Sequence, residues 1–173
     1  MIFLRHPTPD IAPGTCYGRL DMGLAKSAAN EIMRAVNRLK SVPYLCSSPA
    51  KRCIALAEAI AEKHGVEILT DERLLELDFG RWEGLRWDKI DRAESDLWAS
   101  DPINQSPPDG ESFAEMSTRV RAALAELPEH AVIVTHAGPI RVARMTYLGM
   151  SFDAAFSEAV PYASPISMTR EVA

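Results

Sequence analysis

Two histidines and two arginines of this chain follow short apolar runs, either directly or in the next turn. They are Arg5, His6, Arg52 and His136. An imidazole can attack phosphorus as a nucleophile, and a free imidazole is mostly neutral near pH 7. The planar guanidinium of arginine is always charged and pairs with two phosphate oxygens at once. These residue types predict a phosphate site that contains a nucleophile, in which the arginines favour the neutral form of the imidazoles.

The apolar runs before these residues are predicted to be strands of one sheet. They cover 2–4, 43–47 and 131–134, with further short strands at 66–69 and 166–169. Segments with one apolar face, typical of helices, lie between the strands. They cover 24–39, 49–63, 112–127 and 138–148. This alternation predicts an α/β fold, a three-layer α/β/α sandwich with a mainly parallel central sheet.

The order of strands and polar residues also predicts where the site lies. Ligands of open parallel sheets bind in the crevice beyond the carboxyl ends of the strands. His6 and His136 each follow a strand, and Arg52 falls in the first turn of the helix after a third strand. If these strands are neighbours, the side chains converge. Gly138 opens a helix after His136, where N–H groups are predicted to bind an anion, and Arg141 reaches either the substrate or a surface partner.

Several residues are typical of helix ends. Ser48 is the predicted N-cap of the second helix, with Pro49 at its first helical position. Gly65 is predicted to end that helix. Ser112 and Glu115 have the spacing of a capping box at the start of a later helix.

A leaving alkoxide needs a proton, and Glu76 is the best candidate donor. Its neighbours include Leu75, Leu77 and Phe79, which predict a half-buried carboxyl group. Such a setting favours the protonated form, which can donate. Asp78 is the alternative donor in the same segment.

The composition argues against several classes of protein. Of the 173 residues, 24 are acidic and 19 basic, a formal charge of −5 that disfavours binding to nucleic acid or to a membrane surface. The first residues lack the pattern of a signal peptide, and no apolar run approaches the ~18 residues of a transmembrane helix. Cys16, Cys46 and Cys53 form no CxxC pair and are predicted to be reduced packing thiols. These features predict a cytoplasmic protein.

The length suits a single domain over 1–173, with a cap-like insertion at about 71–110. That insertion holds all three tryptophans, Trp82, Trp87 and Trp98. The simpler interpretation is that they pack the insertion. The alternative is that Trp87 or Trp98 stacks on an aromatic leaving group such as a nucleoside base.

Five segments give the sequence a resemblance to a known family. They are Leu4-Arg5-His6, Ser47-Ser48-Pro49-Ala50-Lys51-Arg52, Glu76-Leu77-Asp78-Phe79-Gly80-Arg81-Trp82-Glu83-Gly84, Gly110-Glu111-Ser112 and Thr135-His136-Ala137-Gly138. In this order they resemble the phosphoglycerate-mutase-like branch of the histidine phosphatase superfamily over essentially the whole chain. The resemblance implies that His6 is the phosphorylated nucleophile and that Glu76 is the proton donor. It also implies a phosphoryl clamp and no requirement for a metal or other cofactor. The clamp residues are Arg5, Arg52 and His136.

The resemblance further implies a phosphatase that acts on a small phosphorylated substrate. The candidate substrate-binding residues are Tyr17, Gly18, Ala137 and Arg141. Within the family, the segment 12–21 and the pair Arg52-Cys53 are most similar to α-ribazole phosphatases. Those enzymes act in the nucleotide-loop stage of cobalamin assembly, so α-ribazole 5′-phosphate is the predicted substrate.

Two other functions remain open. A phosphoglycerate mutase would share this machinery, but the mutases of the family have longer chains. A non-catalytic regulator that binds a phospholigand is supported by Pro7, which stands where the family usually has glycine. Pro7 has no N–H to offer a phosphate oxygen, although its carbonyl can still orient His6. The sequence makes no prediction about oligomeric state.

Overall fold

The structure is a computed structural model that describes residues 1–169, and its centre is a five-stranded sheet with the strand order β3-β2-β4-β1-β5. The strands are β1 (Ile2–Arg5), β2 (Leu45–Ser47), β3 (Ile68–Thr70), β4 (Val132–Thr135) and β5 (Ile166–Ser167). The first four are parallel, and β5 pairs antiparallel with β1. The predicted mainly parallel sheet is therefore confirmed.

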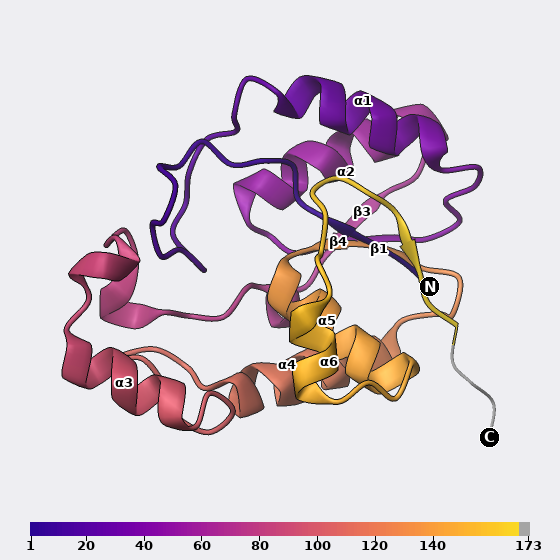
Figure 1. The fold of residues 1–173 in the computed structure, drawn as a ribbon. Helices are drawn as coiled ribbons and strands as arrows, with labels where there is room; N and C mark the ends of the chain where they lie inside the picture. Colours follow the sequence, from indigo (N-terminus) through magenta and orange to yellow (C-terminus); the bar gives the residue numbers. More distant parts are fainter. Residues whose placement is uncertain (170–173) are drawn as a thin grey trace.

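Helices cover both faces of the sheet. Those on its two sides are α1 (Ala28–Arg38), α2 (Lys51–His64), α4 (Phe113–Glu126), α5 (Ala137–Tyr147) and α6 (Phe152–Ser157). A further helix, α3 (Arg92–Ser100), lies away from the sheet in the segment 71–110 (Figure 1). Figure 1 shows α1 and α2 on one side of the sheet and α4, α5 and α6 on the other. This arrangement confirms the predicted three-layer sandwich.

The strands separate two hydrophobic cores because successive side chains of a strand point to opposite faces. Leu4 and Val134 pack with α1 and α2. Phe3 and Ile133 pack with α4 and α5 on the opposite face. Residues buried on both sides in this way are typical of parallel strands, which explains why the sequence shows continuous apolar runs instead of alternation.

Some of the predicted helix ends are confirmed. Gly65 ends α2 in the left-handed conformation, with φ 66°, a backbone geometry that glycine adopts without steric cost. The capping box of Ser112 and Glu115 forms at the start of α4, with both of its reciprocal hydrogen bonds.

Two predicted helix starts are wrong. The helix predicted over 24–39 begins at Ala28, since Leu24 instead forms a β-bridge with Pro9. The second helix begins at Lys51, so Ser48 is not its N-cap and Pro49 is not its first residue. The Ser48 hydroxyl is bonded to His136 across the sheet edge. A tertiary contact therefore replaces the local cap.

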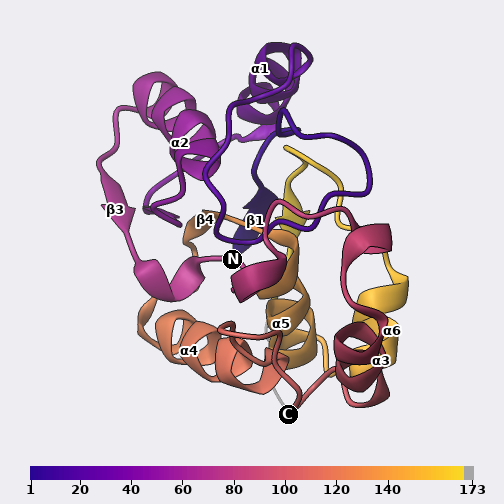
Figure 2. The ribbon, with the colours of Figure 1, turned by 90° about the vertical axis from the view of Figure 1, so that its left-hand side faces the viewer.

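The segment 71–110 has little regular structure besides α3. It contains three short 3-10 helices, η1 (Glu72–Leu74), η2 (Gly80–Trp82) and η3 (Trp87–Lys89). In Figure 2 it runs from the end of β3 across the molecule to α4. Trp82 is 2% exposed and lies against Trp87 and Trp98, with ring centroids 6.3 and 5.8 Å away. Trp82 and Trp98 therefore pack this segment, whereas Trp87 is 42% exposed.

Within the described part of the chain, no helix has both the length and the apolar character needed to cross a membrane.

Candidate active site

The His6 imidazole is held in one tautomer at the carboxyl end of β1. Its Nδ1 lies 2.7 Å from the carbonyl oxygen of Pro7, and its backbone N–H donates to the carbonyl of Thr135 on the neighbouring strand. A carbonyl oxygen can only accept, so Nδ1 carries the hydrogen. In the neutral ring the lone pair is then on Nε2, for which the structure gives no hydrogen-bond partner among residues 1–169. The atom free to act as a nucleophile is Nε2.

His136 follows β4 and lies beside His6, with ring centroids 5.2 Å apart. Its Nδ1 is 3.1 Å from Nη2 of Arg52, and its Nε2 is 2.8 Å from Oγ of Ser48. A guanidinium can only donate, so Nδ1 accepts and Nε2–H donates to Ser48. The two histidines are therefore held in opposite tautomers by neighbours that come from different strand ends.

Burial keeps both imidazoles neutral. His6 is 1% exposed, and burial, followed by the charge of Arg52, lowers its pKa to about 3 even though the Pro7 carbonyl opposes the shift. Burial is also the first cause of the low pKa of His136, well below the usual value, and Arg52 is the second. The sequence pointed to the arginines as the cause, but burial contributes more. A neutral His6 at pH 7 has the lone pair that a nucleophile needs.

The two clamp arginines are anchored mainly by the protein itself. Nη1 of Arg52 donates to the carbonyl of Leu20 at 3.0 Å, and Nη2 donates to the carbonyl of Gly18. Arg5 donates to the carbonyl of Val160 at 3.0 Å and to the hydroxyl of Tyr17 at 3.2 Å. These bonds fix both guanidiniums in place before any ligand arrives, which reduces the entropy lost when an anion binds.

Three arginines around the site keep a buried donor without a partner. They are Arg5, Arg52 and Arg141, and in each case the atom is Nε. Buried donors are nearly always satisfied in folded proteins, because an unmade hydrogen bond costs about 1–3 kcal/mol. Three such donors from separate elements indicate a site for an anion that accepts several hydrogen bonds.

A cavity of about 220 Å³ is lined by two of these arginines, Arg5 and Arg141, whereas Arg52 and the two histidines are not among its lining residues. Arg5, Tyr17, Glu76 and Arg141 contribute polar groups to one side of it, and Ala137 also lines it. Its other side is mostly apolar and aromatic. That side is formed chiefly by Leu77, Phe79, Trp87, Phe113, Met116 and Phe156. The cavity is smaller than the ~300–1,000 Å³ of pockets for drug-sized ligands, so it suits a small substrate.

Glu76 lies at the wall of this cavity with its carboxylate at the start of α5. Its Oε1 and Oε2 accept from the N–H of Gly138 at 3.0 and 3.2 Å, and Oε1 also accepts from the N–H of Leu77. A Cβ on Gly138 would lie 2.2 Å from Oε1, so glycine is needed for this approach. The Gly138 N–H predicted to bind an anionic ligand thus binds the Glu76 carboxylate instead.

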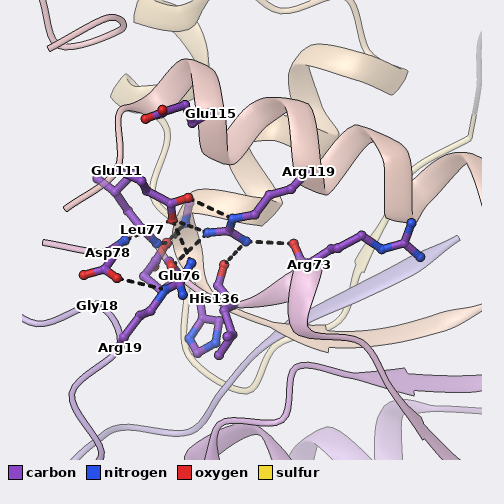
Figure 3. A network of polar contacts seen from close by, with 12 residues as sticks. Gly18, Arg19, Arg73, Glu76, Leu77, Asp78, Glu111, Glu115, Arg119 and His136 are labelled. Carbon is purple, nitrogen blue, oxygen red and sulfur yellow. Dashed lines mark hydrogen bonds and ion pairs between the residues drawn. The ribbon is translucent and has the colours of Figure 1, made fainter. Parts of the chain in front are cut away.

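The segment that carries Glu76 is held by Arg119 of α4 (Figure 3). The Arg119 guanidinium donates to the carbonyls of Arg73, Leu75 and Glu76 at 2.8, 2.7 and 3.0 Å. Glu111 pairs with the same guanidinium and accepts from the N–H of Asp78 at 3.1 Å. One partly buried ion pair therefore fixes the backbone on both sides of Glu76.

The remaining predicted residues divide into those at the cavity and those behind it. Tyr17, Ala137 and Arg141 line the cavity, as expected of substrate-binding residues, but Gly18 does not. A Cβ on Gly18 would lie 1.8 Å from the carbonyl oxygen of Leu77, so Gly18 allows close packing of two loops. Asp78, the alternative proton donor, does not line the cavity; it lies 3.6 Å from Nε of Arg19. The geometry favours Glu76 of the two carboxyl groups.

Sequence reasoning did not find two residues of the site. The local pattern predicts a helix cap at Ser48 and no contact with the histidines, although Ser48 follows β2 at the same sheet edge as they do. Tyr162 stacks on the guanidinium of Arg5, 3.8 Å from Cζ to the ring centroid, and lies 5.5 Å from the ring of His6. No local pattern marks Tyr162, because it reaches the site through a long-range bridge with Arg5.

Cys16, Cys46 and Cys53 are buried free thiols, as predicted. Burial raises the pKa of Cys16 to about 12, so this thiol is not a nucleophile near neutral pH. Among residues 1–169 there is no group of three or more histidine, cysteine, aspartate or glutamate side chains placed to hold a metal ion.

The molecule is an α/β sandwich that has two buried imidazoles and several arginines at the ends of its parallel strands. The chain belongs to the histidine phosphatase superfamily, branch 1, whose family model matches residues 1–171. Its enzyme class is that of a phosphatase.

Individual relatives and solved structures agree with this membership. The chain is 28% identical to "Phosphoserine phosphatase 1" of Hydrogenobacter thermophilus, over 87% of this chain and 76% of that protein. It is 33% identical to "Probable phosphoglycerate mutase GpmB" of Salmonella arizonae, over 77% of this chain and 66% of that protein. The crystal structure of the alpha-ribazole phosphatase from Shigella flexneri matches with a TM-score of 0.85 at 21% identity, covering 94% of this chain and 86% of that one. At that identity the structural match speaks for the fold alone.

Proposed function

We propose that this phosphatase hydrolyses a small phosphate monoester through a phosphohistidine intermediate on His6. One observation carries the proposal. The Nδ1–H of His6 is committed to the Pro7 carbonyl, which leaves the Nε2 lone pair free in a site bordered by arginines with unpaired Nε donors. A neutral nucleophile beside fixed positive charge is what phosphoryl transfer requires.

In the first step, Nε2 of His6 attacks phosphorus and the bond from phosphorus to the ester oxygen breaks. The electron pair of that bond leaves with the alkoxide, and the protonated carboxyl group of Glu76 supplies the proton that it needs. Arg5 and Arg52, whose Nε donors are unpaired, hold the equatorial oxygens of the phosphoryl group. His136, whose ring nitrogens bond to Arg52 and Ser48, contributes to this clamp by fixing the Arg52 guanidinium. The Pro7 carbonyl holds the Nδ1 hydrogen and so stabilises the positive charge that develops on the ring.

In the second step, water attacks the phosphohistidine. Glu76, now a carboxylate, takes a proton from the water as the bond from phosphorus to nitrogen breaks. His6 returns to its neutral form and inorganic phosphate leaves. The same carboxyl group thus acts as an acid and then as a base, as microscopic reversibility allows.

The leaving group is the finer part of the proposal. The resemblance to α-ribazole phosphatases makes α-ribazole 5′-phosphate a candidate substrate, with Trp87 at the cavity wall as an aromatic surface for the base. The relative named phosphoserine phosphatase makes O-phosphoserine a second candidate. We propose the general reaction for this chain and treat each named ester as a test compound.

A phosphate-release panel tests the function. It should include α-ribazole 5′-phosphate, O-phosphoserine, nucleotides, sugar phosphates and p-nitrophenyl phosphate, each with wild type and His6→Ala. We expect release from at least one alkyl ester by wild type and none by His6→Ala. Absence of release from every ester by the wild type, with phosphate still bound in a titration, would favour the non-catalytic regulator instead.

The similarity to a relative named as a probable phosphoglycerate mutase supports a second candidate function, that of a mutase. A mutase shares the phosphohistidine step but returns the phosphoryl group to a sugar acid. Incubation with 3-phosphoglycerate separates the two functions, because a phosphatase releases phosphate and glycerate whereas a mutase produces the 2-phosphoglycerate isomer.

A further inference from the structure

Two arginines of α5, one turn apart, have opposite surroundings. Arg144 is 6% exposed and donates to the carbonyls of Glu158 and Ala159 at 3.1 and 3.0 Å. The side chain of Arg141 has no hydrogen bond and no ion pair to any residue between 1 and 169. Arg144 is therefore a structural residue, whereas nothing in the described chain satisfies the guanidinium of Arg141.

The Arg141 guanidinium is nevertheless held in place. Its Cζ lies 4.6 Å from the ring centroid of Phe156, a cation–π contact that leaves the donors in the plane of the guanidinium free. Both residues line the 220 Å³ cavity, together with Arg5 and Glu76. Arg141 thus faces the space that a leaving group would occupy.

The charges around Arg141 favour an anion at this point. Burial lowers the pKa of Arg141, and the like charges of Arg5 and Arg144 act in the same direction. The Glu76 carboxylate opposes this shift, and it becomes neutral when it takes the proton that it later donates. A negative group on the ligand would replace that lost charge and satisfy the unpaired Nε donor.

We propose that Arg141 is the centre of a second anion subsite, which binds an oxyanion on the leaving group of the substrate. This inference rests on the proposed function and deepens it, because it names a substrate class: small phosphate esters whose leaving group itself carries a carboxylate or a second phosphate. α-Ribazole 5′-phosphate has no such group on its leaving side. Under this inference it is a poorer substrate than a short acidic ester.

A matched pair of esters tests the subsite. We would compare 3-phosphooxypropionate with its amide, which has nearly the same shape but no negative charge on its leaving group. Loss of a charge-assisted hydrogen bond lowers the affinity for a ligand about ten-fold or more. We therefore expect kcat/KM for the acid to exceed that for the amide by at least ~10-fold. 1,3-Propanediol bisphosphate, compared with propyl phosphate, is the second arm and distinguishes a phosphate-binding subsite from a carboxylate-binding one.

The variant Arg141→Gln should bring the ratio of acid to amide close to one. The matched control is Arg144→Gln, which removes a buried arginine from the same helix and is expected to lower the unfolding temperature while keeping the ratio. An equal rate on acid and amide in the wild type would overturn the subsite. So would a ratio that Arg141→Gln leaves unchanged.

Failure of the subsite can be separated from failure of the proposed reaction. Binding of the two esters to His6→Ala, measured by calorimetry, needs no turnover. Tighter binding of the acid than of the amide, abolished by the added Arg141→Gln change, supports the subsite even if no ester is hydrolysed. Equal binding alongside active hydrolysis of both esters overturns the subsite and leaves the phosphatase function standing.

Discussion

The nucleophile and the proton donor are positioned in different ways. His6 follows β1, His136 follows β4, and Arg52 lies in the first turn of α2. The register of the sheet therefore sets the positions of these residues. Glu76 lies in an irregular segment between η1 and η2, and its backbone is placed by the side chain of Arg119 (Figure 3). Regular elements fix one half of the site, and a single ion-paired arginine fixes the other.

This difference indicates which half should be sensitive to distant changes. Several backbone hydrogen bonds between neighbouring strands together hold the strand that precedes His6. No single side chain outside the site therefore controls the position of His6. Three carbonyls around Glu76 depend on one guanidinium, and removal of that group leaves buried acceptors unpaired. A substitution outside the site should therefore displace Glu76 more readily than it displaces His6.

The largest expected effect concerns the donor itself. Glu76→Gln keeps the size and polarity of the side chain but removes the acid, and a general acid contributes about 10²–10⁴-fold. We expect a loss of that order in kcat/KM on an alkyl phosphate. On p-nitrophenyl phosphate, whose leaving group departs without a proton, single-turnover formation of phosphohistidine should fall much less. Equal losses on both esters would show that Glu76 only shapes the site.

A smaller effect is expected when the support of Glu76 is removed. Arg119→Lys keeps the charge but cannot reach the three carbonyls together, so we expect kcat on an alkyl phosphate to fall roughly 10- to 100-fold. Phosphohistidine formation from p-nitrophenyl phosphate should again change less, as in Glu76→Gln.

The control for this variant is Arg73→Gln. The Arg73 side chain pairs with Asp71 and Glu126 in the same neighbourhood but does not hold the carbonyls. Arg73→Gln should not alter the ratio of the rate on the alkyl phosphate to the rate on p-nitrophenyl phosphate. If this ratio is the same in Arg119→Lys as in the wild type, Arg119 has no role in positioning Glu76.

The smallest effect concerns the nucleophile side and is seen in stability. The pKa of His6 is about 3 in the folded chain and about 6.5 when unfolded, so below pH 6.5 only the unfolded chain takes up this proton. The free energy of unfolding should therefore decrease as the pH falls from 6.5 towards 3, by about 1.4 kcal/mol per pH unit from His6 alone. Urea unfolding between pH 5 and 7 should give a shallower pH slope for His6→Asn than for wild type. Identical slopes would mean that His6 is protonated in the folded state.

The same division explains how much the sequence could predict. Apolar runs and the polar residues after them are local signals, so the sheet and the convergence of His6, Arg52 and His136 could be predicted. Arg119 could not, because its partners lie more than forty residues away in a segment without periodicity. Local rules likewise predict no role for Glu111, which in the structure pairs with Arg119 and accepts from the N–H of Asp78.

The wrong predictions have a related cause. Ser48 and Pro49 have the local pattern of a helix start, yet the Ser48 hydroxyl forms a bond with His136 that no local rule contains. Likewise, the predicted anion site at Gly138 is occupied by the Glu76 carboxylate from a distant loop. In both places a residue that is distant in the sequence forms the hydrogen bond for which the local pattern predicts a different partner.

The central claim, that His6 carries the phosphoryl group, is tested most directly by trapping the intermediate. The enzyme would be mixed with a labelled alkyl phosphate, quenched rapidly under basic conditions and analysed by mass spectrometry of its peptides. We predict a label on His6 that survives base, is lost in acid and is absent from His6→Ala. A label that is stable to acid, or that persists in His6→Ala, would contradict the claim.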